Sequence, residues 1–304
     1  MRYSSRRDFL QASAAVLAAI ALRNSLGLNE KPLKLAYSTL GCPDWSFSQI
    51  IDFAKLHGYS AIEVRGIQKQ MDLTKCKEFN SEKSRKETLT MMKDKGLQFI
   101  NLGSSANMHL TDATESKKNL DEARSFIDLA KEIKCPYVRV FPNKISKDQK
   151  EATIEMIAQR LNQLGEYAKD KNVTVLMETH GEAVWADDIL KIMELAGHDH
   201  TGLVWDICNM WTVTKEPPAD VYKKLSKYIY HTHIKDAKLE NNVPNYVLLG
   251  KGDVPIFEAI DLLAKNNYKG YYSFEWEKMW HPEIAEPEVA LADYAAAMNK
   301  HFRL

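Results

Sequence analysis

The chain has 304 residues, of which 45% are hydrophobic, which is enough for one large core but short for two domains of ordinary size. Lysine plus arginine and aspartate plus glutamate both number 41, so the net charge is zero. Binding to nucleic acid depends on an excess of positive charge, and this balance does not indicate it. We therefore expect one domain and no nucleic-acid partner.

The first residues resemble an export signal. Arg6 and Arg7 precede Phe9-Leu10 and a small apolar run from Ala12 to Leu22, which is similar to a bacterial twin-arginine signal. We expect residues 1–31 to be this signal and a short linker. The protein would then be periplasmic, either released or tethered to the membrane by an uncleaved signal. An ordinary amphipathic helix with a basic start is the alternative, and no other run is long and apolar enough to cross a membrane.

The four cysteines, Cys42, Cys76, Cys135 and Cys208, show neither a CxxC spacing nor a zinc-finger pattern. Export would permit disulfides, but the spacing identifies no pair. We expect all four to be small buried hydrophobic residues.

From Leu33 onward, short β-rich runs alternate with helical patterns, and this alternation favours a parallel sheet with crossover helices. Eight such units in about 270 residues match a closed barrel of eight parallel strands, so we predict an α/β fold, a (β/α)8 TIM barrel, over residues 32–304. The eight runs are Leu33 to Ser38, Ala61 to Arg65, Gln98 to Leu102, Tyr137 to Phe141, Val173 to Glu178, Gly202 to Asp206, Ile229 to Ile234, and Tyr271 to Glu275.

An open doubly wound sheet is the alternative fold, although neither of its usual phosphate turns, GxGxxG or GxxxxGK[ST], occurs. The helices between the strands are predicted from apolar stripes, one of which follows the candidate cap Ser46. A second stripe consists of Ile154, Ile157, Leu161, Leu164 and Ala168. The stretch from Asp236 to Pro255 is predicted to be a long loop, either covering the substrate or idle at the surface.

Four consecutive predicted strands end in residue types that bind metals. These are Glu178, Asp206, His233 and Glu275, and the active site of such a barrel lies at the C-terminal ends of its strands. One such residue alone would be read as a solvated group or a helix cap. Burying four side by side is unfavourable unless a cation offsets their charge, so we expect one divalent ion. The oxygen-rich set favours Mn²⁺ or Mg²⁺, with Co²⁺ or Zn²⁺ as alternatives.

Residues of the same strand parity as these ligands are expected to face the same cavity. His180, Lys235 and Glu277 are therefore candidate substrate contacts, although a salt bridge to Asp236 or another carboxylate explains Lys235 equally well. Glu63, Arg65 and Arg139 end the second and fourth strands, and pairing among themselves is as good an interpretation as substrate binding. Trp276 is a candidate to stack on a sugar ring, whereas Trp205 and His231 are expected in the core. The remaining candidate contact is Asn209.

Several of these segments together resemble the motifs of the xylose-isomerase-like barrel superfamily. They are Met177-Glu178-Thr179-His180, Trp205-Asp206, His231-Thr232-His233-Ile234-Lys235-Asp236 and Ser273-Phe274-Glu275. The resemblance runs from Leu33 to the C-terminus and is greatest to the sugar phosphate isomerase/epimerase group, which includes tagatose 3-epimerase and inosose dehydratase. It implies a divalent ion on Glu178, Asp206, His233 and Glu275, with both glutamates also transferring protons.

One position departs from the family pattern. Members often carry a histidine three residues after the sixth-strand aspartate, where this chain has Asn209. In the related endonuclease branch that histidine helps to hold zinc ions, so its replacement weighs against DNA repair. The substrate contact at Asn209 stays open.

The chemistry expected from this site is proton transfer next to a carbonyl group. A divalent ion would stabilise the enediolate, while one of Glu178 and Glu275 removes the α-proton and the other returns one. The product is an epimer or an isomer, depending on which face or carbon receives the proton. We therefore expect an isomerase or epimerase of a small sugar, keto-sugar or polyol.

The alternatives are dehydration of a keto-inositol or related keto-sugar, an endonuclease-like phosphodiesterase, and a non-catalytic sugar-binding protein. The sequence does not separate epimerisation, isomerisation and dehydration, because one constellation serves all three. A homo-oligomer is compatible with the sequence.

Overall fold

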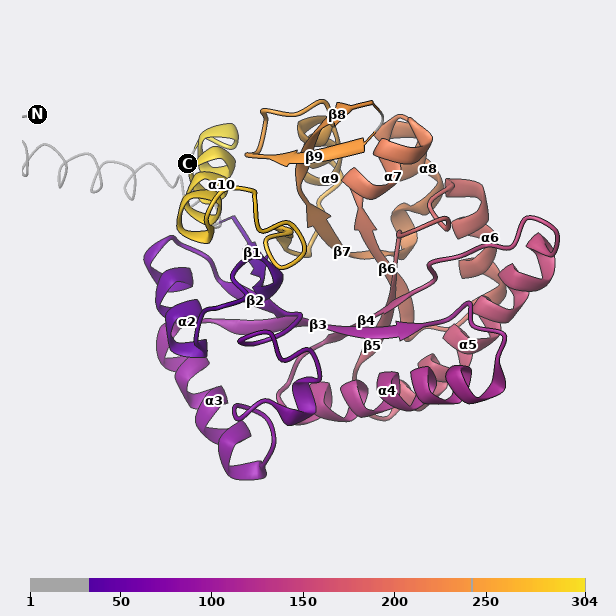
Figure 1. The fold of residues 1–304 in the computed structure, drawn as a ribbon, viewed down its shortest axis with the longest axis horizontal. Helices are drawn as coiled ribbons and strands as arrows, with labels where there is room; N and C mark the ends of the chain where they lie inside the picture. Colours follow the sequence, from indigo (N-terminus) through magenta and orange to yellow (C-terminus); the bar gives the residue numbers. More distant parts are fainter. Residues whose placement is uncertain (1–32, 242, 304) are drawn as a thin grey trace, which may run out of the picture. The chain divides into compact units, whose positions relative to one another are not determined.

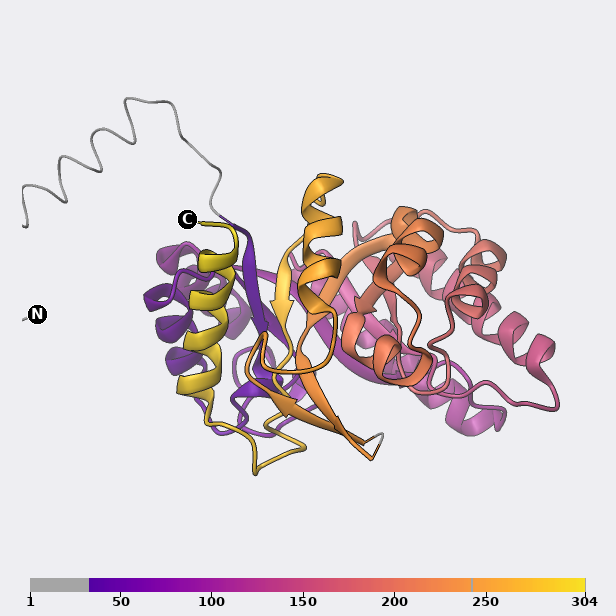
Figure 2. The same cartoon turned by 90° about the horizontal axis from the view of Figure 1, so that it is seen from above.

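The computed structural model describes residues 33–241 and 243–303, so the predicted signal over residues 1–31 lies outside the described residues. Eight strands close into a parallel barrel in the order β1-β10-β7-β6-β5-β4-β3-β2 (Figures 1 and 2). The predicted (β/α)8 barrel is confirmed, and each predicted run contains or overlaps one strand. The barrel strands are β1 (Leu35–Ser38), β2 (Ala61–Val64), β3 (Gln98–Asn107), β4 (Tyr137–Phe141), β5 (Thr174–Glu178), β6 (Thr201–Asp206), β7 (Ile229–Ile234) and β10 (Tyr272–Phe274).

Helices alternate with the strands and lie around the outside of the barrel (Figure 1). None of the described helices is long and apolar enough to span a membrane. The α-helices are α2 (Phe47–Leu56), α3 (Glu82–Lys95), α4 (Ala113–Glu132), α5 (Lys150–Lys169), α6 (Ala186–Ala196), α7 (Ile207–Thr214), α8 (Pro218–Leu225), α9 (Ile256–Lys265) and α10 (Pro287–His301). Three short 3₁₀ turns are η1 (Thr39–Gly41), η2 (Leu73–Lys75) and η3 (Ser226–Tyr228).

The helices begin and end where local chemistry satisfies their free backbone groups. At the start of α2 the predicted cap Ser46 accepts a hydrogen bond from the Gln49 backbone N–H, and the Gln49 side chain accepts one from the Ser46 backbone. The C-terminus of α3 is closed by Gly96, whose φ of 70° lies in the left-handed region that favours glycine. These caps set the lengths of the crossovers between parallel strands.

The core has an outer and an inner part. The predicted stripe of α5 is buried against the sheet, and replacing its fully buried Leu161 by alanine would cost about 2–5 kcal/mol of folding free energy. Inside the barrel, an apolar cluster is formed by Ala36, Ala61, Ile100 and Tyr271, with Tyr137 packed against it. The four cysteines are buried and free, as predicted.

The predicted long loop after β7 is instead ordered as a β-ribbon, in which β8 (Asp236–Glu240) pairs antiparallel with β9 (Val243–Val247). Figure 1 shows this ribbon beside α7. The Asp236 carboxylate fixes its base by accepting hydrogen bonds from the backbone N–H groups of Ala237, Gly250 and Gly252, each at 2.9 Å. A Cβ atom at Gly252 would collide with that carboxylate. The sequence analysis did not predict this ribbon in the first half of the stretch.

Candidate metal and active site

Four side chains with metal-ligand chemistry meet at the C-terminal rim of the barrel. One ligand atom from each of Glu178, Asp206, His233 and Glu275 lies within 4.8 Å of the others. Asp206 and His233 are register partners on β6 and β7, Ser273 of β10 is the partner of His233, and Glu275 follows β10 directly. None of the four is more than 4% exposed. The strand register therefore brings together the four residues that the sequence analysis selected.

The electrostatics of this cluster require positive charge. His233 Nδ1 lies 3.2 Å from Glu275 Oε2, 3.5 Å from Glu178 Oε1 and 3.9 Å from Asp206 Oδ2. Burial raises the pKa of Asp206 to about 7; Lys235 opposes the shift, and the charges of Glu275 and Glu178 add to it. Burial would lower the pKa of His233, but the surrounding carboxylates raise it well above its usual value. The raised pKa values mean that Asp206 and His233 hold protons that offset the negative charge of the cluster. A bound cation would offset the same charge in their place.

The donor atoms of the cluster fit a divalent ion. Glu178 Oε2, Asp206 Oδ2 and His233 Nδ1 are buried and have no hydrogen-bond partner among the described residues. Lys235 Nζ and Arg139 Nε lie 2.8 Å from Asp206 Oδ2 and 3.1 Å from Glu178 Oε2, so the fit to an ion rests on the chemistry of the donor set, three carboxylates and one imidazole. Asp206 Oδ1 accepts a hydrogen bond of 2.8 Å from the Asn209 backbone N–H at the start of α7, which holds the carboxylate in place.

Glu63 orients His233 from inside the barrel. The fully buried Glu63 carboxylate lies 3.0 and 3.1 Å from His233 Nε2 and 2.8 Å from His231 Nε2. When Nε2 of His233 donates to Glu63, its Nδ1 keeps a lone pair for the cluster, the usual carboxylate–histidine arrangement behind a metal. Burial would raise the pKa of Glu63, but the charge of His233 and the hydrogen bonds from both histidines hold it well below its usual range.

This position corrects the prediction for Glu63. The predicted pairing with Arg65 or Arg139 is wrong, because the carboxylate faces two histidines of β7. His231 is fully buried, as predicted for a core histidine. The contact between Glu63 and His231 joins residues 168 positions apart, and no local pattern signals such a contact.

Lys235 joins the carboxylates of the rim. Its Nζ donates to Glu275 Oε2 at 2.5 Å and to Glu277 Oε1 at 2.7 Å, and it lies 2.8 Å from Asp206 Oδ2. Burial would lower the pKa of Lys235, but Asp206, Glu275 and Glu277 raise it well above its usual value. Lys235 is thus a fixed ammonium group within the site. Of the two interpretations, the structure shows the salt bridge, although with other carboxylates than Asp236.

His180 is held in one tautomer at the end of β5. Asn143 donates through Nδ2 to Asn107 Oδ1, so Asn143 Oδ1 accepts from His180 Nδ1 at 2.7 Å. Nε2 of His180 therefore carries the lone pair. Burial lowers the pKa of His180, so the ring is neutral near pH 7. Sequence reasoning missed both asparagines, because asparagines at strand ends and in the loops that follow are common and carry no distinctive spacing.

Trp276 does not face the site. Its side chain is 1% exposed, stacks on Phe274 with ring centroids 5.5 Å apart, and donates through Nε1 to the Ala285 carbonyl at 2.9 Å. The predicted stacking of Trp276 on a sugar is wrong, because this residue has the opposite strand parity to Glu275. Trp205 is also buried, as predicted for a core residue.

Arg139 of β4 approaches the cluster from the neighbouring strand. The guanidinium is 1% exposed, its Nε lies 3.1 Å from Glu178 Oε2, and it stacks 3.7 Å above the Phe141 ring. Burial would raise the pKa of Glu178, but the charge of Arg139 together with the charge and hydrogen bond of His233 holds it below its usual value. Arg139 therefore helps to keep Glu178 ionised.

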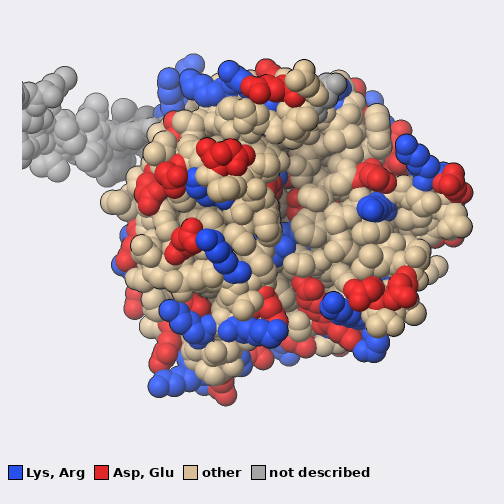
Figure 3. Space-filling model, viewed as in Figure 1, with Lys and Arg blue, Asp and Glu red and all other residues tan. Residues whose placement is uncertain are grey.

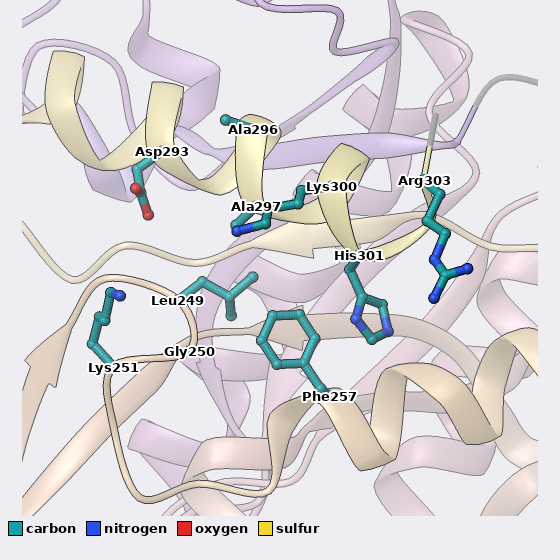
Figure 4. Close-up of a pocket in the computed structure, with 10 residues that line it drawn as sticks. All are labelled: Leu249, Gly250, Lys251, Phe257, Asp293, Ala296, Ala297, Lys300, His301 and Arg303. Atoms are coloured by element: carbon teal, nitrogen blue, oxygen red, sulfur yellow. The ribbon is translucent and has the colours of Figure 1, made fainter.

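The surface has other features away from this cluster. On the face shown in Figure 3, positive and negative side chains are interspersed. A surface groove of about 570 Å³ lies between the turn after β9 and helices α9 and α10, where Phe257 stacks on His301 (Figure 4). Its lining includes Lys251, Lys300 and Arg303 but none of the four ligand candidates. The groove and the cluster are therefore separate.

Comparison with known proteins identifies the family. A family model described as xylose isomerase-like TIM barrel matches residues 51–300. The chain belongs to this family. A structure described as IOLI protein with a binding zinc atom has a TM-score of 0.71 at 16% identity, covering 88% of this chain and 98% of that one. That structure shares the barrel fold of this chain.

Curated relatives in this family include dehydratases and an epimerase. The chain is 27% identical over 227 residues to 3-dehydroshikimate dehydratase of Bacillus anthracis, covering 71% of this chain and 78% of that protein. It is 25% identical over 207 residues to fructoselysine 3-epimerase of Shigella flexneri, covering 66% of this chain and 71% of that protein. It is 28% identical over 149 residues to inosose dehydratase of Clostridium botulinum, covering 43% of this chain and about half (49%) of that relative. These relatives support an enzyme that modifies small sugars or related polyols.

Proposed function

We propose that the protein is a metal-dependent isomerase or epimerase of a small sugar, keto-sugar or polyol, acting by proton transfer next to a carbonyl group. The observation that carries this proposal is the placement of two carboxylates in one cluster, with Glu178 and Glu275 3.5 and 3.2 Å from His233 Nδ1. Two carboxylates at one reacting centre can remove a proton and return it from different directions. The similarity to fructoselysine 3-epimerase supports it.

Glu178, Asp206, His233 and Glu275 would hold the divalent ion, for which Mn²⁺ is our first choice. When bound, the ion supplies Lewis-acid stabilisation of the negative charge that develops on the substrate carbonyl oxygen. Glu178 and Glu275 stay ionised, because Arg139 lowers the pKa of Glu178 and His233 with Lys235 lowers that of Glu275, in both cases against burial. An ionised carboxylate is the form that accepts the α-proton. Lys235 fixes Glu275 through its 2.5 Å hydrogen bond.

Dehydration of a keto-sugar or keto-inositol is the second candidate. The observation that favours it is His180, which adds a third group able to transfer protons two residues after Glu178, with its Nε2 lone pair positioned to accept one. In loss of a β-hydroxyl the α-proton passes to a base such as His180 Nε2, which then gives that proton to the leaving oxygen as water departs. The dehydratases among the relatives support this candidate.

A reconstitution assay tests both candidates. The protein is stripped of metal, reloaded separately with Mn²⁺, Mg²⁺, Co²⁺ and Zn²⁺, and incubated in D₂O with keto-sugars, aldoses and keto-inositols. We expect NMR to show deuterium entering the carbon next to the carbonyl, together with an epimer, an isomer or a dehydrated enone. Glu166→Gln, a change at a surface carboxylate that is 63% exposed, is the matched control and should keep full activity. Saturable sugar binding without any exchange would instead indicate a binding protein.

We propose also that residues 1–31 are a twin-arginine signal that exports the folded protein to the periplasm. The support is the Arg6-Arg7 pair ahead of a short apolar run. Changing both arginines to lysine should leave the protein in the cytoplasm, whereas the control Arg23→Lys should not. Fractionation that finds the double variant and the wild type in one compartment contradicts this proposal.

A further inference from the structure

Two arginines form a basic arc on the rim beside the acidic cluster. Arg65 follows β2, Arg139 lies on β4, and both side chains reach over β3, which lies between them. A Cβ atom at Gly103 of β3 would lie 2.7 Å from Arg65 Cδ and 2.9 Å from Arg139 Nη2. The missing side chain at Gly103 is therefore what lets both arginines occupy this space. We call Arg65 and Arg139 the basic arc, and the ligand candidates of β5, β6, β7 and β10 the acidic arc.

The two guanidinium groups are buried but incompletely paired. Arg139 is 1% exposed, and its Nη1 has no hydrogen-bond partner among the described residues. The carboxylate within ion-pair distance of Arg139 is Glu178, itself a ligand candidate, and Arg139 Nε makes no aligned hydrogen bond to it. Arg139 is thus a nine-tenths buried cation with donor capacity to spare.

Arg65 has only neutral partners. It is 7% exposed and donates through Nη1 to the Gly103 carbonyl at 3.3 Å and through Nη2 to Ser105 Oγ at 2.9 Å. No carboxylate of the described residues lies within 4.0 Å of its guanidinium. Burial and the charge of Arg139 lower the pKa of Arg65 to about 10. The two buried guanidinium groups repel each other, and Glu178 pairs with Arg139 but not with Arg65, so a further anion between them would be favourable.

We propose that the basic arc binds a carboxylate group of the substrate, so that the substrate is a keto-sugar acid or a carboxylated keto-polyol rather than a neutral sugar. The inference rests on the proposed function, because it places the carbonyl at the acidic arc and the carboxylate at the basic arc of one rim. A planar carboxylate presents two oxygens that match guanidinium donors. Arg65 already commits Nη1 and Nη2 to Gly103 and Ser105, and the few donors left suit two oxygens better than the three of a phosphoryl group.

Matched ligands that differ only in charge test this inference. The probes are D-glucuronate against D-glucuronamide and quinate against quinamide, with D-glucose 6-phosphate as a phosphoryl probe. Kd is measured by titration calorimetry on Mn²⁺-loaded protein and checked by thermal shift. We expect the wild type to bind one or both carboxylates about tenfold or more tightly than the amide, the scale of a charge-assisted hydrogen bond. The phosphate ester should bind more weakly than the carboxylate.

Arginine variants assign the preference to the basic arc. Arg65→Gln and Arg139→Gln should each reduce the ratio of carboxylate affinity to amide affinity to within about threefold of unity. Arg139→Lys should restore this ratio in part, because lysine keeps the positive charge but lacks the planar guanidinium that donates two parallel hydrogen bonds. Arg124→Gln, at an arginine of α4 paired with Asp121, is the control and should leave the ratio unchanged. Metal content is measured for each variant, since Arg139 contacts a ligand candidate. If Arg139→Gln does not fold, Arg65→Gln carries the test.

Three results overturn the inference: equal binding of carboxylate and amide by the wild type, a preference that survives both glutamine variants, or tighter binding of the phosphate ester. Its failure is separable from failure of the proposed function. Proton exchange on neutral keto-sugars together with equal binding of both probes removes the carboxylate site alone. A carboxylate preference without exchange on any keto substrate, neutral or carboxylated, removes the proton-transfer function and keeps the site.

Discussion

The acidic and basic arcs occupy the same rim and are built on the same kind of parallel strand, yet they handle buried charge differently. On the acidic arc, Lys235 and His233 lie among the carboxylates, and one ligand atom from each of the four candidates lies within 4.8 Å of the others. On the basic arc, Arg65 and Arg139 face each other across Gly103, and Glu178 is the nearest carboxylate. The difference teaches that neighbouring strands of one rim can gather carboxylates on one side and guanidinium groups on the other.

The largest effect is expected from the carboxylates of the acidic arc. Glu178→Gln and Glu275→Gln each keep the size and one oxygen ligand but remove the base, so turnover should fall about 10²-fold or more. Metal content should fall less than turnover. Deuterium exchange into the substrate, measured by NMR in D₂O, separates the two glutamates, because one variant should still exchange the α-proton without forming product. Two variants that bind metal and turn over near the wild-type rate would show that another group carries the proton.

A smaller effect is expected behind the acidic arc, at Glu63. Glu63→Gln puts a neutral amide against His231 and His233, so the tautomer of His233 is no longer fixed by a carboxylate. Mn²⁺ affinity should fall about 10- to 100-fold, as it does when such an outer carboxylate is lost. Competition with a fluorescent chelator measures this change. Ser273→Ala, which removes only the weaker 3.5 Å contact to Glu63, is the control. An unchanged affinity in Glu63→Gln would show that the carboxylate is structural only.

The two arcs also differ in how far the sequence predicted them. The acidic arc could be predicted from the sequence. Acidic residues and histidine are rare at buried strand ends, yet they recurred at the ends of four successive barrel strands. For the basic arc the sequence did not decide between pairing and substrate binding. The arrangement of the two arginines depends on Gly103, which lies on the strand between them and belongs to no recognisable motif. The partners of Glu63 were not predicted, since its position at the end of the second strand did not show that His231 and His233 of the seventh strand lie opposite it.

A moderate effect is expected from filling the space between the arginines. Gly103→Ala adds a methyl group 2.7 Å from Arg65 Cδ and 2.9 Å from Arg139 Nη2, so at least one guanidinium must shift. Overpacking of this kind costs about 1–3 kcal/mol of folding free energy. The carboxylate preference should fall several-fold and Mn²⁺ affinity should fall less, because the methyl group meets both arginines directly but reaches the ligand candidate Glu178 only through Arg139. An equal loss of both would mean that the two arcs are not independent.

The smallest effect on binding is expected outside both arcs, at Trp276. Its ring lies between Phe274 and the segment that carries Ala285, so Trp276→Phe loses one buried hydrogen bond and leaves a carbonyl unsatisfied. This should lower the free energy of unfolding by about 1–3 kcal/mol, measured by urea denaturation. Kd for the probe ligands should stay within about twofold, because the indole does not line the rim. A sugar affinity that falls tenfold while stability is kept would instead place Trp276 in contact with the substrate, and would reverse the correction made from its burial.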